Sequence, residues 1–386
     1  YASRTGTYSP LCTWRRGDDG ALVGFMEIPL ALGTVGGTLR VHDAARFGLQ
    51  VAGVDSAQEL SMLAACVGVA SNFAALRALD ALEPGLGERW TAHVDSFTED
   101  WEVLRQHYFE HPWQRATPPD AVRRRFDSRE MLHKRLRRTL KDERLRDLAT
   151  FPFLADGHDP RNVPAWMGLV AYLEQRFGTW HVPGGMARIA EVLGRRLTTR
   201  GVTVLLSTPA RDVVVREGRA VAVRTDAGDI EADEVVVAVD PRGLPALAPL
   251  VERTMPAIPP VVCHVGLEGE VPDLPHEVVL HGDPLLVVRT GGQAPEGRHA
   301  WSIHGRGKIA QDQLRALARH RIDVRAQLVH RVDRSPRELV QQWGSSPLGV
   351  LWQGRGTVRA RLGPDTPIPH LHAAGAHATP GAGLPF

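Results

Sequence analysis

The stretch that most constrains the fold is residues 181–241, which begins with a helical pattern followed by a strand pattern. Apolar residues recur at helical spacing over residues 186–197, and Gly201 stands where a left-handed residue ends a helix. Residues 202–206 are almost purely apolar, as in a strand buried on both faces of a parallel sheet. The sequence therefore predicts a helix of about four turns that leads into a buried parallel strand.

The second half of this stretch predicts an antiparallel excursion and a return strand. Strand patterns at residues 212–215 and 220–224 flank a Glu-Gly turn at residues 217–218, and a further turn follows at residues 226–229. The run at residues 234–241 is a second apolar strand that ends at a proline. The alternation of helix and strand predicts an α/β fold with a mixed sheet.

These residues resemble the middle of FAD-dependent oxidoreductases of the phytoene desaturase (carotenoid desaturase) and amine oxidase superfamily. The resemblance is carried by the Pro-Gly-Gly-Met turn at residues 183–186, by Gly-Val-x-Val at residues 201–204, and by residues 209–214. A second match at residues 372–386 looks like the family's flavin-proximal Gly-Ala-x-x-x-Pro-Gly-x-Gly-Leu-Pro element. Two matches in the correct order identify the chain as a relative of this family over residues 80–386.

The resemblance implies an FAD cofactor and a lipid-soluble isoprenoid or carotenoid-like substrate. The backbone around Val213 is then expected near the adenosine. In the carboxyl-terminal element the family places residues beside the flavin, and here these are Gly375, Pro380, Gly381, Gly383 and Leu384. The implied reaction is a two-electron oxidation in which the flavin accepts hydride and the substrate gains a double bond. The resemblance assigns no catalytic side chain.

Residues 1–79 resemble a different enzyme, the class II hydroxymethylglutaryl-CoA reductase. The motifs are Glu-Ile-Pro-Leu-x-Leu-Gly-Thr-Val-Gly-Gly at residues 27–37, the segment 53–60, and the segment 67–79. Candidate strands lie around residues 11–16 and 22–28, and helices follow, so this part is expected to be an α+β reductase fragment. The alternative function is therefore a mevalonate-forming reductase that uses NAD(P)H. Its catalytic residues and nicotinamide site cannot be assigned within the matched stretch.

The sequence does not open with the strand, Gly-x-Gly-x-x-Gly turn and helix that receive a pyrophosphate in FAD proteins of this kind. We expect FAD binding to be weakened for this reason, and the neighbouring strands to expose apolar edges. The chain reads as a fusion of two isoprenoid-pathway sequences joined near Leu79 and Asp80. A non-catalytic fusion product is the second alternative.

Two amphipathic helices are predicted between the reductase-like part and the central stretch, over residues 90–107 and 123–148. The second has a leucine stripe at Leu132, Leu136 and Leu140, and its other face is basic. A basic face can lie on an anionic membrane, or it can be a solvated face with internal ion pairs. The aromatic residues 151–176 fit either a tunnel for a hydrocarbon or an ordinary core.

Five regions are expected along the chain: a reductase-like part at 1–79, substrate-side helices at 80–180, a partial FAD-binding region at 181–260, a substrate domain at 261–365, and the flavin-proximal element at 366–386. In the substrate domain, strands are predicted near residues 261–266, 277–280, 285–289 and 301–304, and a helix at 311–320.

Composition adds further expectations. The three cysteines are widely separated, which predicts buried thiols in a reducing cytoplasm and no metal site. No apolar run is long enough for a transmembrane helix, so we expect a cytoplasmic protein, with peripheral membrane contact as the open alternative. The net charge of +2 gives no sign of a nucleic-acid partner, and the sequence does not indicate an oligomeric state.

Overall fold

A computed structural model describes residues 12–16, 22–26, 56–60, 62, 76–109, 119–126, 128–178, 182, 185–308 and 312–379. The chain divides into two compact units, Tyr1–Ala92 and His93–Phe386. No helix in the described ranges is long and apolar enough to cross a membrane.

The first unit contains a β-hairpin and a short helical region. Strands β1 (Cys12–Arg16) and β2 (Leu22–Met26) pair antiparallel, which confirms the two predicted strands. Residues 76–82 are helical, and α4 (Leu86–Asp95) follows after a turn. Asp80 fixes this turn because its Oδ1 accepts hydrogen bonds from the backbone N–H groups of Gly85 at 3.1 Å and Gly87 at 2.9 Å.

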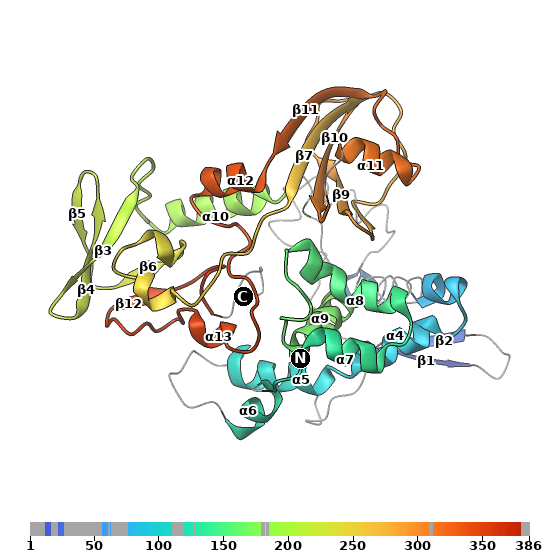
Figure 1. Ribbon diagram of the computed structural model, residues 1–386, viewed down its shortest axis with the longest axis horizontal. Helices are drawn as coiled ribbons and strands as arrows, with labels where there is room; N and C mark the ends of the chain where they lie inside the picture. Colours follow the sequence, from blue (N-terminus) through green and yellow to red (C-terminus); the bar gives the residue numbers. More distant parts are fainter. Residues whose placement is uncertain are drawn as a thin grey trace. The chain divides into compact units, whose positions relative to one another are not determined.

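The second unit begins with helices (Figure 1). They are α5 (Thr98–Leu104), a π-helical turn (Arg105–Phe109), α6 (Asp120–Phe126), α7 (Leu132–Thr139), α8 (Glu143–Ala155), a 3₁₀ turn (Ala165–Gly168) and α9 (Leu169–Phe177).

Both long helices predicted for this region are wrong in extent, because each is broken. The first, over residues 90–107, breaks between α4 and α5, where Phe97 is fully buried in a non-helical conformation. Ser96 Oγ donates to the carbonyl oxygen of His93 at 2.6 Å, a local bond that competes with helix continuation. The second, over residues 123–148, is divided among α6, α7 and α8. Helix α8 begins after Asp142, which is its N-cap.

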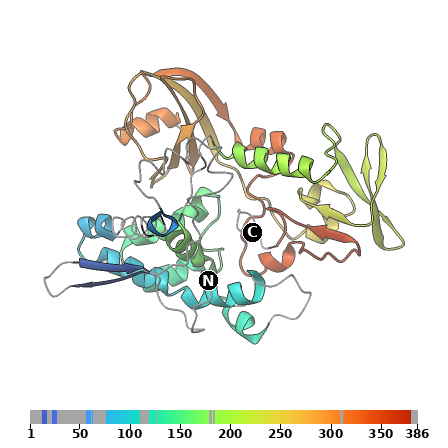
Figure 2. The same cartoon turned by 180° about the vertical axis from the view of Figure 1, so that it is seen from behind.

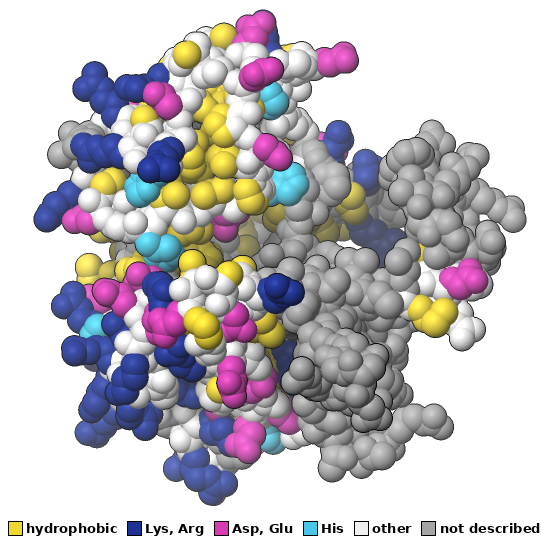
Figure 3. Space-filling model, turned by 90° about the vertical axis from the view of Figure 1, so that its right-hand side faces the viewer, with side chains coloured by type: hydrophobic (Ala, Val, Ile, Leu, Met, Phe, Trp, Pro, Cys, Tyr) yellow, Lys and Arg dark blue, Asp and Glu magenta, His cyan; other side chains and the backbone are white. Residues whose placement is uncertain are grey.

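The predicted leucine stripe is buried in the core, which confirms that prediction. On the basic face, several arginines form ion pairs with nearby carboxylates. Leu132, Leu136 and Leu140 are all buried. Basic and acidic side chains are interspersed over the lower half of the space-filling view (Figure 3). The pairs include Arg138 with Glu130 at 3.0 Å and Arg144 with Asp142 at 2.7 Å. Much of the positive charge on these helices is therefore locally neutralised.

The hairpin predicted after the central helix is confirmed. Strands β3 (Ala210–Arg216), β4 (Arg219–Thr225) and β5 (Gly228–Glu231) form an antiparallel sheet in that order. Glu217 and Gly218 both have positive φ, at 49° and 77°, which matches the twist of a tight hairpin turn.

The predicted helix is also confirmed, as α10 (Ala187–Thr199), but the predicted strand at residues 202–206 is wrong. This run has no strand conformation, and Leu206 is 81% exposed. An apolar run becomes a parallel strand only when other strands flank it. Among the residues with a described position, no strand pairs with this run.

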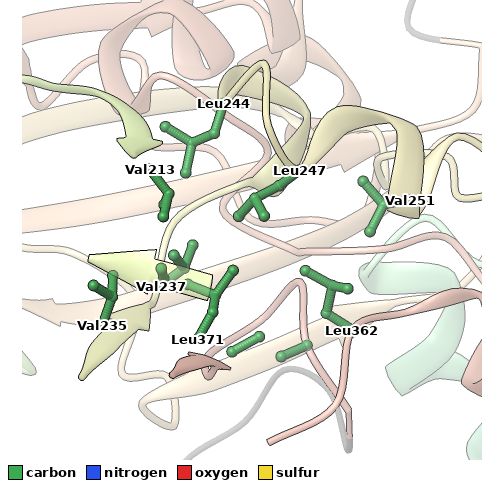
Figure 4. Close-up of a cluster of buried hydrophobic side chains, with 11 residues drawn as sticks. Val213, Val235, Val237, Leu244, Leu247, Val251, Leu362 and Leu371 are labelled. Atoms are coloured by element: carbon green, nitrogen blue, oxygen red, sulfur yellow. The ribbon is translucent and has the colours of Figure 1, made fainter. Parts of the chain in front are cut away.

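A small parallel sheet organises the next part of the core. Strands β6 (Val235–Val237) and β12 (Leu371–Ala373) pair in parallel, with Leu371 opposite Val235. The short 3₁₀ turns Pro241–Gly243 and Ala248–Val251 follow β6. Leu244 and Leu247, between the two turns, and Val251, in the second turn, pack with buried side chains of β3, β6 and β12 in one cluster (Figure 4).

The largest sheet has five antiparallel strands in the order β11-β7-β10-β9-β8. Their bounds are β7 (Val261–Glu268), β8 (Glu277–Leu280), β9 (Leu285–Gly292), β10 (Arg298–Arg306) and β11 (Leu328–Arg334). Helix α11 (Gln313–Arg319) covers one face and forms the second core cluster with it (Figure 2). The predicted strands and helix of this region are confirmed, and Cys263 is a free, buried thiol.

Two short helices precede β12. Helix α12 (Pro336–Trp343) starts with a capping box between Ser335 and Glu338, and it ends at Gly344 in the left-handed region. Helix α13 (Thr357–Ala360) lies between α12 and β12 in the chain.

Candidate functional site

The carboxyl ends of β6 and β12 form the candidate site, because ligands of parallel sheets bind where adjacent strands end. The two strands run parallel, so the residues that follow them emerge at the same edge. The N–H of Ala374 donates to the carbonyl oxygen of Val237 at 2.9 Å and holds the two exits together. The loop after β6 carries Asp240 and Arg242, and the loop after β12 carries Gly375 and His377.

Gly375 permits the sharp turn that leaves β12. Its φ is +83°, and a Cβ at this position would lie 3.3 Å from the carbonyl oxygen of Ala238. A side chain would therefore be both strained and tightly packed against the loop after β6. The turn therefore keeps the backbone of the loop after β12 close to the backbone of the loop after β6.

A partly buried polar network joins the loops after β6 and β12. Asp240 caps the 3₁₀ turn that follows β6 and holds Arg242 in a bidentate pair, with bonds of 2.9 and 2.8 Å. His377 is 5% exposed, and its Nδ1 lies 3.2 Å from Nη2 of Arg242. Its Nε2 lies 3.1 Å from the carbonyl oxygen of Ser346.

These contacts fix the protonation of His377. A carbonyl oxygen can only accept and a guanidinium can only donate, so Nε2 carries the hydrogen and Nδ1 is the acceptor. Burial lowers the pKa of His377, and the positive charge of Arg242 acts in the same direction, although Asp240 opposes it. Neutral His377, in the loop after β12, thus bonds Arg242 in the loop after β6 and connects the two loops.

The structure places two of the six predicted cofactor-binding residues within its described ranges. The side chain of Val213, on β3, packs in the same core cluster as Ala373 and Ala378, which flank Gly375. The backbone N–H of Val213 donates to Oδ1 of Asp212 at 2.8 Å. Pro380, Gly381, Gly383 and Leu384 lie outside the described residues.

The resemblance to FAD-dependent oxidoreductases places one end of an FAD molecule at this edge. The Gly375 turn brings the backbone after β12 close to the backbone after β6, at the carboxyl end of a parallel strand. In the described ranges, no glycine-rich turn joins a strand to a helix in the way that receives a pyrophosphate. No group of three or more His, Cys, Asp or Glu side chains there is arranged to hold a metal ion.

Sequence reasoning missed Arg242 and His377. The Asp-Pro pair at residues 240–241 is a signal for a capped turn and could have identified the loop. The contact between Arg242 and His377 joins residues 135 positions apart, which no local pattern encodes.

The amino ends of β6 and β12 carry a different polar cluster. Glu234 bridges two histidines, with 2.9 Å to Nδ1 of His370 and 3.1 Å to Nε2 of His372. His372 also donates from Nδ1 to the carbonyl oxygen of Pro364 at 2.9 Å. A pocket of about 390 Å³ lies here, lined by Arg219, Ala220, Val221, Glu231, Ala232, Asp233, Glu234 and His370. Its lining includes Glu234 and His370, which precede the two strands, so it is distinct from the candidate site at their carboxyl ends.

The Glu234 cluster predicts a pH-dependent contribution to stability. The carbonyl of Pro364, followed by Glu234, raises the pKa of His372, and its two histidine partners lower the pKa of Glu234. The histidine's contribution is complete below pH 6.5 and is lost as pH rises through its raised folded pKa. The carboxylate's contribution is complete above pH 4.5 and is lost as pH falls through its lowered folded pKa.

Substitution Glu234→Gln is therefore expected to lower the melting temperature most between pH 4.5 and 6.5. The effect is small, about 1 °C, because the pair is exposed to solvent. Thermal melts of both proteins at pH 5.5 and pH 9 measure it. An equal difference at both pH values would contradict the pairing.

Comparison with known families agrees with this architecture. The family described as flavin containing amine oxidoreductase matches residues 54–384, and the chain belongs to this family. The family described as hydroxymethylglutaryl-coenzyme A reductase matches residues 2–83. Both resemblances predicted from the sequence are confirmed.

Individual relatives cover only parts of the chain. The all-trans-zeta-carotene desaturase of Myxococcus xanthus is 30% identical over 189 residues, which are 45% of this chain and 35% of that protein. The 4,4'-diapolycopene oxygenase of Methylomonas sp is 26% identical over 168 residues, 41% of this chain and 34% of that protein. The chain thus spans about a third of the length of these curated relatives.

The amino-terminal similarity is closer but shorter. The 3-hydroxy-3-methylglutaryl-coenzyme A reductase of Archaeoglobus fulgidus is 49% identical over 74 residues, 19% of this chain and 17% of that protein. Among solved structures, an oxidoreductase from Methanosarcina mazei has a TM-score of 0.47 and 18% identity, and the alignment covers 64% of this chain and 63% of that one.

Proposed function

We propose that the chain is an FAD-dependent oxidoreductase that introduces double bonds into an isoprenoid or carotenoid-like substrate. The observation that carries this proposal is the carboxyl edge of β6 and β12, with its glycine turn at Gly375, in a chain whose family is flavin-containing. Carotenoid desaturases among its relatives support the substrate class.

FAD would lie across this edge. Backbone groups at Gly375, Gly381 and Gly383, together with Pro380 and Leu384, would hold the flavin end, and the backbone around Val213 would lie near the adenosine. The flavin supplies the hydride acceptor when it is bound. Asp240, Arg242 and His377 are positioning residues that hold the two loops around the turn, and His377 stays neutral in that role.

The substrate is lipid-soluble, so its source is a membrane or another lipid phase. We infer that the chain works in the cytoplasm with peripheral access to that phase. Part of the basic face can contact an anionic lipid surface, because Lys134, Arg137 and Lys141 are exposed.

The function is tested by incubating the chain with FAD and phytoene in liposomes and following product absorption. Each added conjugated double bond shifts the absorption to longer wavelength, so new bands in the visible region are expected. Unchanged phytoene, with FAD bound, would contradict desaturation of this substrate. A parallel assay with hydroxymethylglutaryl-CoA and NADPH is expected to show no oxidation of NADPH, because the reductase similarity covers residues 2–83 and includes no assignable catalytic set.

A further inference from the structure

Helix α10 carries an apolar stripe that is open to solvent. Met186, at the N-cap, and Ile189, Leu193 and Leu197 recur three and four residues apart, so their side chains share one side of the helix. Leu193 is 58% exposed, Met186 and Leu197 are also exposed, and no residue of the helix is buried. A helix in a folded chain normally buries such a stripe against a core. This stripe is therefore available to a partner.

The run at residues 202–206 continues the apolar surface. The N–H of Val202 donates to the carbonyl oxygen of Leu197 at 3.0 Å, so the run leaves directly from the end of the stripe. All five of its residues are exposed, and none of them is charged. Contiguous exposed apolar side chains mark an interaction surface. The name α10 surface is used below for Met186, Ile189, Leu193, Leu197 and residues 202–206 together.

Uncompensated arginines accompany the apolar stripe. Arg195, Arg196 and Arg200 are exposed, and none of them pairs with a carboxylate in the part of the chain that the structure describes. Arg188 differs, because it pairs with Glu191 at 2.8 Å. The helix and its C-cap are therefore positively charged overall. An apolar stripe on a helix whose other side is rich in arginine is typical of helices that lie in the interface of an anionic membrane.

The charge of the α10 surface disfavours a second copy of the chain as its partner. In a symmetric dimer this surface would face itself, which would bring Arg195, Arg196 and Arg200 of the two copies close together. Like charges repel at such short range. Anionic lipid headgroups attract the same arginines. Charge complementarity therefore favours a lipid surface.

The basic face of α7 differs from the α10 surface in one respect. Lys134 and Arg137 are exposed there, but Leu132 and Leu136 on the other side of α7 are buried in the core. Helix α7 can therefore add only electrostatic attraction, which salt screens. The α10 surface offers positive charge and apolar area together, and both contribute to membrane affinity.

We propose that the α10 surface docks the chain on an anionic phospholipid membrane. Its apolar side chains lie at the boundary between headgroups and acyl chains, about 5–10 Å deep, and Arg195, Arg196 and Arg200 contact lipid phosphates. The choice of a lipid partner over a protein partner rests on the proposed function, whose substrate is lipid-soluble. Docking holds the chain at the phase that supplies this substrate.

Co-sedimentation of the full chain with vesicles, without FAD or substrate, tests the proposal. The unmodified chain is expected to bind vesicles of phosphatidylcholine and phosphatidylserine at about 3:1, and to bind pure phosphatidylcholine about tenfold more weakly. The variant Leu193→Asn/Leu206→Asn is expected to bind the mixed vesicles about tenfold more weakly, because it removes apolar area from the acyl boundary. The variant Arg195→Gln/Arg196→Gln/Arg200→Gln should lose about a hundredfold, roughly fivefold for each arginine.

The matched control is Arg298→Gln/Arg315→Gln/Arg319→Gln. It changes the net charge by the same amount, at three exposed positions on β10 and α11 that lie outside the α10 surface. It should bind the mixed vesicles within about twofold of the unmodified chain, because charges more than a Debye length from the lipid are screened. The substituted positions in all three variants are exposed, so their melting temperatures should match that of the unmodified chain.

Failure of the unmodified chain to bind the mixed vesicles would overturn the proposal. Binding that survives in both α10 variants, or that falls equally in the control, would do the same. A dimer that the leucine variant dissociates in sedimentation velocity, without vesicle binding, would assign the surface to a second copy. Product formed from phytoene without vesicle binding would overturn the docking site alone. Vesicle binding with unchanged phytoene would overturn the proposed desaturation alone.

Discussion

Substitution Gly349→Ala is expected to destabilise the second unit by about 3 kcal/mol or more, since two separate costs coincide. The φ of Gly349 is +70°, which disfavours any residue with a Cβ. A Cβ there would also overlap the backbone carbonyl group of Ala376, in the loop after β12, and backbone cannot move aside as a flexible side chain can. The melting temperature should fall by roughly 6–12 °C.

Gly344→Ala is the matched control for this prediction. Gly344 has a φ of +68°, but a Cβ at that position would meet nothing within 4 Å. Only the conformational cost applies, about 1 kcal/mol. Comparing the melting temperatures of the two variants separates the cost of a positive φ from the cost of the steric overlap with Ala376. Equal losses would contradict the close approach between Gly349 and Ala376.

Substitution Leu371→Ala is expected to cost about 3 kcal/mol, because it opens a cavity in the core beneath the candidate site. Leu371 is the first residue of β12 and is 1% exposed. It packs with Val235, Leu247 and Leu362 in the cluster shown in Figure 4. Chemical denaturation should show a lower midpoint with an unchanged slope.

Val236→Ala tests the opposite side of the same pair of strands. Val236 lies opposite His372 but is 63% exposed, so its truncation should cost less than about 1 kcal/mol. A loss as large as that of Leu371→Ala would show that the outer face of β6 is covered in solution. Such a result would contradict the arrangement described for β6 and β12.

Local patterns predicted the elements whose signals are complete within a few residues. The helix α10 and the Glu217-Gly218 hairpin depend on periodicity and on turn chemistry, and both were found as predicted. The predicted strand at residues 202–206 is absent. An apolar run indicates only that a segment tends to be buried, whereas a strand forms only where adjacent strands can pair with it. The predicted helix over residues 90–107 is broken at Ser96, whose hydroxyl donates to the carbonyl oxygen of His93 in place of a helical backbone bond.

The candidate site was predictable in part for the same reason. The glycine at 375 stood out through its strand-end motif, and the structure gives it the positive φ that such a turn requires. The network of Asp240, Arg242 and His377 depends on two distant loops that meet only after β6 and β12 pair. No pattern within either loop could predict that contact.

The visible spectrum of the purified full chain, recorded after incubation with excess FAD and desalting, tests the central claim most directly. We predict a retained flavin band near 450 nm, roughly the maximum expected of a bound flavin. We also predict that Gly375→Ala lowers the retained flavin several-fold, since its Cβ would crowd Ala238 at the strand end. A colourless protein after desalting would contradict FAD binding at the carboxyl edge of β6 and β12.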